Sequence, residues 1–117
     1  MGQIIFYKTK DLSLISSFYQ NQLNFKIWID QKSCHILKGN NLLLGFCQSD
    51  IIEKETMITF FYKTIKEVDD IHKNQFPSSN PPKENEKYNI YQFFAEDPEG
   101  RTLEFQHFLH TIDWVWS

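Results

Sequence analysis

The chain has 117 residues, of which 41% are apolar, and a formal net charge of −3 at pH 7. This length is enough for one compact domain with a real core and too short for two conventional ones, so we expect a single domain over residues 1–117. The lysines are scattered and form no basic stripe for a phosphate backbone, which excludes nucleic acid as an expected partner. No apolar run approaches the roughly 18 residues of a bilayer span, so we expect no membrane partner and a cytoplasmic location.

Aromatic residues and cysteines are the unusual parts of the composition. Eleven Phe, five Tyr and three Trp must fill a core, line a cavity or build an interface in so small a domain. Cys34 and Cys47 lack CxxC spacing, and we expect them to be small buried apolar residues rather than a disulfide. Trp114 and Trp116 are expected to fold over a sheet, cap a pocket or pack against a second subunit.

The first half of the chain predicts a strand, a helix and three further strands. β-Branched and aromatic residues indicate a strand over residues 3–9. Apolar residues at helical spacing after Asp11 predict an amphipathic helix over residues 11–23. Three short apolar runs separated by turn residues then predict an antiparallel meander over residues 25–30, 33–38 and 41–48.

The second half repeats this order after a charged linker. A strand is predicted at 57–63, and Thr64 with Glu67 forms a capping box that begins a helix over residues 64–76. The proline-rich stretch 77–87 predicts an exposed loop with at most a short edge strand. Strands at 88–96 and 101–108 are joined by Asp97-Pro98-Glu99-Gly100, whose Pro and Gly positions are typical of a type I turn.

The repeated order indicates an internal duplication. The tetrapeptide FYKT supports it, because it closes a strand before a helix at residues 6–9 and again at 61–64. We therefore predict one module over about residues 3–48, a linker at 49–55, a second module over about 56–108 and a C-terminal tail at 109–117.

Two stretches carry a resemblance to a known family. They are DLSLISSFYQNQLNF at residues 11–25, with Asn24 where glycine is usual, and FFAEDPEGRTLEFQ at residues 93–106. Both are similar to motifs of the vicinal oxygen chelate superfamily, which includes glyoxalase I, bleomycin-resistance proteins and extradiol dioxygenases. The resemblance implies an α+β fold of paired βαβββ modules that form a curled mixed sheet around a cleft, and a homodimer.

The resemblance also implies where a metal would bind, on the first and last strands of each module. In this chain Glu104 alone carries a ligand group among those positions, the others being Ile4, Leu43 and Met57, or Thr59 in place of Met57 if FYKT sets the register. One carboxylate does not make a zinc site or an octahedral site, so we expect no metal and no other cofactor. The alternative is a divalent metal in a rearranged site built from His35, Glu104 and a third donor.

Glu104 has three interpretations. It faces solvent or pairs with a neighbour such as Arg101, it anchors a cationic or hydrogen-bonding group of a ligand, or it is a general base. The resemblance implies a ligand-binding cleft lined by the equivalent strand positions of the two modules. Its residues are Ile4, Phe6, Lys8, Leu43, Met57, Thr59, Phe61 and Glu104.

The histidines point to no conventional site. His107 and His110 are three residues apart on a predicted strand and should point to opposite faces, so we expect no shared metal. We expect His72 to be solvated and His35 to have a hydrogen-bonded structural role.

The favoured function is metal-free binding of a small apolar or aromatic molecule, similar to the drug-sequestering resistance proteins. The alternatives are a glyoxalase-like lyase or isomerase that uses Glu104 as base or metal ligand, and a dimeric structural module without a ligand.

Overall fold

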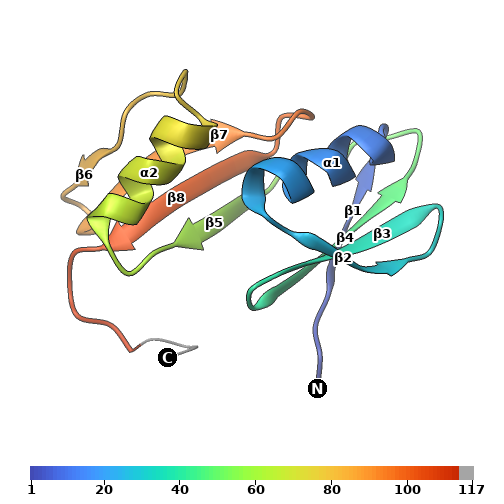
Figure 1. Ribbon diagram of the computed structural model, residues 1–117, viewed down its shortest axis with the longest axis horizontal. Helices are drawn as coiled ribbons and strands as arrows, with labels where there is room; N and C mark the ends of the chain where they lie inside the picture. The colour runs from blue at the N-terminus through green and yellow to red at the C-terminus, as the bar shows by residue number, and fades with distance from the viewer. Residues whose placement is uncertain (114–117) are drawn as a thin grey trace. The chain divides into compact units, whose positions relative to one another are not determined.

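The computed structural model describes residues 1–113 and consists of two βαβββ modules (Figure 1). The predictions for Trp114 and Trp116 lie outside the described residues. Neither helix of the described chain is long and apolar enough to cross a membrane. The first module contains β1 (Ile5–Thr9), α1 (Leu12–Leu23), β2 (Lys26–Asp30), β3 (Cys34–Gly39) and β4 (Leu42–Gln48). The second contains β5 (Met57–Phe61), α2 (Ile65–Gln75), β6 (Lys83–Asn85), β7 (Ile90–Glu96) and β8 (Thr102–Phe108).

Strand pairing repeats between the modules. The sheet orders are β1-β4-β3-β2 and β5-β8-β7-β6, and in each sheet the first pair is parallel and the others are antiparallel. This arrangement confirms the predicted α+β class and the paired βαβββ modules, and it takes the form of two open four-stranded sheets. The contacts define two compact units: residues 1–55 with 97–100, and residues 56–96 with the segment from 101 onward.

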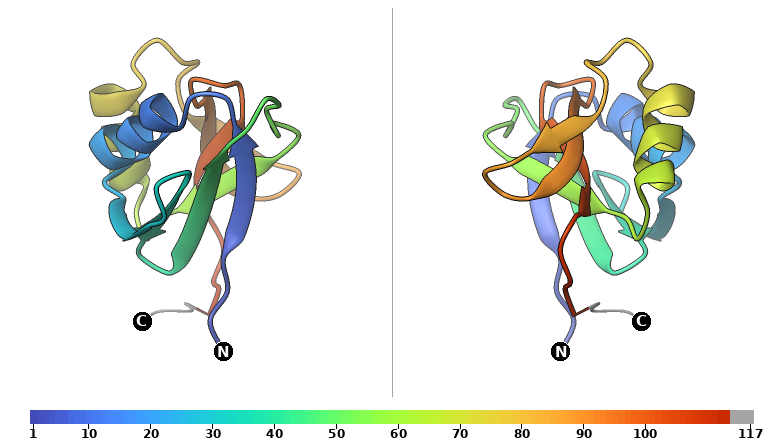
Figure 2. Two further views of the ribbon diagram at one scale, coloured as in Figure 1. Left: turned by 90° about the vertical axis from the view of Figure 1, so that its right-hand side faces the viewer. Right: turned by 90° about the vertical axis from the view of Figure 1, so that its left-hand side faces the viewer.

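In unit 1, α1 covers one face of its sheet (Figures 1 and 2). Leu12, Ile15 and Tyr19 are buried on the helix, and the ring centroids of Tyr19 and Phe46 lie 5.1 Å apart. The helix ends at Asn24, which adopts the left-handed conformation with φ 59°. Asparagine tolerates this conformation better than most residues, which explains why it can replace the usual glycine.

In unit 2, α2 likewise covers one face of its sheet (Figures 1 and 2). Phe105 on β8 stacks between Phe60 on β5 and Phe93 on β7, with centroid distances of 5.1 and 4.8 Å, and Phe76 lies 5.2 Å from it. The side chain of Thr64 accepts the backbone N–H of residue 67, which confirms the predicted helix cap. Four of the eleven phenylalanines therefore pack together beside α2.

The turn at residues 97–100 belongs to unit 1 by its contacts. The Gly100 amide donates to the Asp97 carbonyl at 3.0 Å, which closes the predicted turn. The Tyr19 hydroxyl donates to the buried Asp97 carboxylate at 2.8 Å. Glu99 accepts the Thr9 hydroxyl and the backbone N–H of Lys10 at 3.0 Å. The two motifs of the sequence thus contact each other directly.

The cysteines correct the expectation of two free apolar side chains. Cys34 and Cys47 are directly opposed on the antiparallel strands β3 and β4, with Cα atoms 4.0 Å apart, and form a disulfide. The pairing register decides this result, because it places both side chains on the same face of the sheet at the distance of a close cross-strand pair.

Replacing Tyr19 by Phe should destabilise the fold by about 1.5–3 kcal/mol, because the buried Asp97 carboxylate loses a charge-assisted donor. Urea denaturation measures the change. The matched control is Tyr88→Phe, since Tyr88 is 61% exposed, and this variant should unfold like the parent chain. Equal stability of both variants would contradict the assigned role of the Tyr19–Asp97 contact.

Replacing both cysteines by serine should lower the free energy of unfolding by ~3 kcal/mol, since the disulfide closes a loop with a sequence separation of 13 residues. Denaturant unfolding of the oxidised parent, the reduced parent and the double variant checks this. The reduced parent should resemble the variant. If reduction leaves the unfolding curve unchanged, the bond does not contribute as stated.

Candidate functional site

Glu104 is the central side chain of the candidate site. It lies on β8, directly opposite Thr59 on β5 and Phe94 on β7, and only 7% of it is exposed. The Thr59 hydroxyl donates to Glu104 Oε1 at 2.8 Å, and the Gln92 amide donates to Glu104 Oε2. Both carboxylate oxygens are therefore held by neutral donors from the neighbouring strands.

The strand period explains why the carboxylate lies among apolar residues. Phe105, the next residue on β8, points to the opposite face and packs in the core with Phe60 and Phe93. Glu104 instead shares its face with Gln92 and Gln106, both of which are buried. This polar face of the sheet is the one that α2 does not cover.

The sequence interpretation placed Thr59 in the same cleft as Glu104 but missed Gln92 and Asn85. Gln92 donates to Glu104 and in turn accepts the Asn85 amide at 2.7 Å, so the polar contacts continue to β6. The position of Gln92 was predictable from the sequence. The turn at residues 97–100 sets the register of the β7–β8 hairpin, and the alternation of side chains along β7 then places Gln92 on the same face as Glu104. Nothing in the sequence indicated Asn85.

The three interpretations of Glu104 are narrowed by these contacts. The side chain neither faces solvent nor pairs with Arg101, because it is buried and its partners are Thr59 and Gln92. Neutral donors stabilise a carboxylate but leave its net charge uncompensated. The contacts are compatible with a structural side chain held by its neighbours, with a ligand anchor and with a general base.

Four predicted cleft residues belong to unit 1. Ile4 is 36% exposed just before β1, and Phe6 is 47% exposed. The Phe6 ring lies over β4 at Gly45, where an added Cβ would come within 2.4 Å of it, so only glycine permits this placement. Lys8 is exposed, and its backbone N–H donates to the Glu53 carboxylate at 2.8 Å. The fourth residue, Leu43, is half-buried on β4.

The other four residues belong to unit 2. Thr59 and Glu104 are brought into contact, whereas Met57 pairs with Thr102 and is 55% exposed. The Phe61 ring contacts Phe108 edge to face at 5.7 Å. The pairing thus makes Thr59, rather than Met57, the neighbour of Glu104, which is the register that FYKT indicated.

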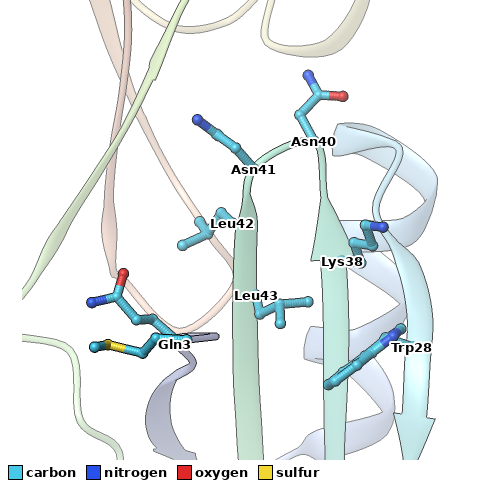
Figure 3. A pocket seen from close by; sticks show the side chains of 8 residues that line it. Gln3, Trp28, Lys38, Asn40, Asn41, Leu42 and Leu43 are labelled. Atoms are coloured by element: carbon cyan, nitrogen blue, oxygen red, sulfur yellow. The ribbon is translucent and has the colours of Figure 1, made fainter. Parts of the chain in front are cut away.

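A shallow pocket of about 360 Å³ lies in unit 1 at the end of the β3–β4 hairpin (Figure 3). Leu43 is the member of the predicted cleft that lines it. The remaining lining is mostly polar and includes the exposed ring of Trp28. The polar lining residues are Gln3, Lys38, Asn40 and Asn41.

His35 and His72 each have a ring nitrogen at hydrogen-bond distance from a partner. His35 Nδ1 lies 2.9 Å from the Ser16 hydroxyl, which gives it the predicted hydrogen-bonded position. His72 corrects the expectation of a solvated ring, because its Nε2 lies 3.0 Å from the Ser79 carbonyl and its ring packs edge to face on Phe93 at 5.0 Å. The helix face of His72 is covered by the following loop.

A metal site of the kind the fold family implies needs several donor side chains close together. Within residues 1–113, no three His, Cys, Asp or Glu side chains are close enough together to hold a metal ion. His107 and His110 contact different backbone carbonyls, those of residues 62 and 111. The four positions that bind a metal in the fold family are occupied here by Ile4, Leu43, Thr59 and Glu104. Only Glu104 offers a carboxylate, so this set of side chains does not fit a metal ion.

Solved structures show which fold this is. A glyoxalase/bleomycin resistance protein/dioxygenase from Nocardioides is similar with a TM-score of 0.78 at 14% identity, over 97% of this chain and 86% of that chain. A family enzyme of the same description from Burkholderia phytofirmans has a TM-score of 0.74 at 20% identity, over 89% and 95%. Lactoylglutathione lyase from Agrobacterium tumefaciens has a TM-score of 0.73 at 15% identity, over 90% and 91%.

No protein-family model matches the sequence, and no curated protein matches it. The likeness to solved structures therefore defines the fold: the chain has the fold of the glyoxalase/bleomycin resistance/dioxygenase proteins. This result confirms the fold that the two motifs indicated.

Two tyrosines of unit 2 have raised pKa values. Burial, with a smaller effect of Glu67, raises the pKa of Tyr62 to about 12. The hydrogen bond to Asp69, followed by burial, raises the pKa of Tyr91 to about 12. Both environments favour the protonated phenol in the folded chain.

Stability should therefore fall in alkali. The contribution of both phenols is fully present below the unfolded pKa of 10.0 and is lost as the pH rises to about 12. Urea unfolding at about pH 9 and about pH 11 measures the slope, which Tyr62→Phe and Tyr91→Phe should each reduce. A slope unaffected by either change would contradict the assignment, and Tyr88→Phe is the control.

Proposed function

We propose that this chain binds a small apolar or aromatic molecule without a metal, at the face of the second sheet around Glu104. The observation that supports the proposal is the buried carboxylate held by Thr59 and Gln92. Phe94 pairs directly with Glu104 and is 50% exposed, so an apolar surface adjoins the charge. Apolar walls with a few fixed polar groups are typical of small-molecule sites.

The charge of Glu104 favours a cationic or hydrogen-bonding group on the ligand. Its hydrogen-bond partners within the described chain, Thr59 and Gln92, are neutral. A cationic group on a ligand would therefore balance the negative charge of Glu104. A drug-sequestering role, as in bleomycin-resistance proteins, agrees with such a ligand. The proposal includes a homodimer and a cytoplasmic location.

The alternative is a glyoxalase-like lyase or isomerase in which Glu104 is the base or a metal ligand. It is favoured by the position of Glu104 on the last strand and by the likeness to a lactoylglutathione lyase fold. A base also needs a group that stabilises the developing oxyanion. Thr59 and Gln92 already donate to the carboxylate itself.

Glu104→Gln separates these roles. We expect 2-naphthylmethylamine to bind the parent chain more tightly than the uncharged 2-naphthylmethanol, and the variant to lose this preference. A charge-assisted contact contributes about 1.5–3 kcal/mol, which is roughly a ten- to hundred-fold change in affinity. Calorimetric titration measures both affinities. The matched control is Glu84→Gln, an exposed position on β6 that loses the same charge.

Three outcomes would contradict the binding proposal. Equal affinities for both probes in the parent chain would exclude a charge-selective site. Loss of a measured turnover in Glu104→Gln with retained affinity would favour the lyase or isomerase. A stoichiometric divalent ion in protein purified without chelator would contradict metal-free binding.

A further inference from the structure

We propose a second ligand site, in the pocket at the end of the β3–β4 hairpin of unit 1, that binds an organic anion with a planar ring, such as an aromatic carboxylate. The pocket lies entirely within unit 1; it includes Leu43 of the cleft expected from the sequence but neither Glu104 nor the residues that contact Glu104. The inference is therefore independent of the proposed function. At about 360 Å³ it is within the size range of small-ligand sites.

A β-bulge supplies the aromatic wall. Ile27 pairs with Leu37 and Ile29 with Ile36, so Trp28 is an extra residue on β2 that has no partner position on β3. Bulges redirect a side chain and are frequent beside functional sites. The indole lines the pocket and is 50% exposed, which leaves it available to stack on a ligand ring (Figure 3).

Two lysines supply a positive charge beside this ring. Lys38 lines the pocket, and Lys26 is its direct cross-strand partner on the same face. Like charges at this spacing repel each other. The ion pairs found in residues 1–113 involve neither of them, so the repulsion is not relieved within the described chain. A carboxylate bound between the two ammonium groups would relieve it.

Amide groups complete the pocket at the other end. Asn40 and Asn41 form the two-residue hairpin turn between Gly39 and Leu42, and their side chains line the pocket with that of Gln3 (Figure 3). Each amide offers both donors and an acceptor. The half-buried Leu43 provides an apolar wall. Together these groups match a flat ring that carries an anionic substituent, rather than an inorganic anion alone.

The experiment is an NMR titration of the ¹⁵N-labelled chain with 2-naphthoate. We expect the NMR signals of the Trp28 indole N–H and of the backbone N–H groups of Lys38, Asn40 and Asn41 to change in chemical shift. Lys38→Gln should weaken binding about five-fold, as for an exposed ion pair. Trp28→Ala should weaken it up to about ten-fold through lost stacking. Lys73→Gln, an exposed lysine on α2, removes the same charge and should leave the affinity unchanged.

Two further ligands and one variant make the result decisive. Inorganic phosphate should bind more weakly than naphthoate, and equal binding would overturn the requirement for a ring. The uncharged 2-naphthylmethanol should also bind more weakly, and equal binding would overturn the role of the lysines. Glu104→Gln should not alter the naphthoate affinity. Shifts confined to other residues, or no shifts at millimolar ligand, would overturn the site.

Discussion

The hydrogen bond from Tyr19 to Asp97 is the contact on which the arrangement of unit 1 depends. It joins residues 78 positions apart in the chain, at a distance of 2.8 Å and out of contact with solvent. Because Asp97 and Glu99 also hold the turn and the start of α1, four residues between two strands of the second module become part of the first unit. Unit 1 is therefore complete only when the turn at residues 97–100 is packed against it.

Each sheet has one face that packs against a helix and one face that its helix does not cover (Figures 1 and 2). In unit 2, Phe60, Phe93 and Phe105 stack under α2, and burial of such rings is the main driving force of folding. On the opposite face the same strands present Glu104 and Gln92. Both oxygens of the buried Glu104 carboxylate accept hydrogen bonds, from Thr59 and Gln92, as buried polar groups require.

Local sequence patterns predicted the helices, strands and turns well. The features that the sequence did not predict depend on contacts between residues distant in the chain. The cap at Thr64 and the turn at residues 97–100 were predictable because each depends on a few adjacent side chains. The Cys34–Cys47 bond was not, because it depends on the β3–β4 register. The surroundings of His72 were also not predictable, because the loop that follows α2 covers its ring.

The sequence by itself determined the order of the elements and the duplicated modules, because both follow from the periodicity of apolar residues. It also showed that Glu104 is the only carboxylate among the expected metal-ligand positions. Only the tertiary structure decided what surrounds that carboxylate. Thr59 and Gln92 reach it from strands 45 and 12 residues away in the chain, and Lys26 meets Lys38 through a bulged pairing. Such neighbours are set by strand register, and one residue of slip would turn every side chain to the other face.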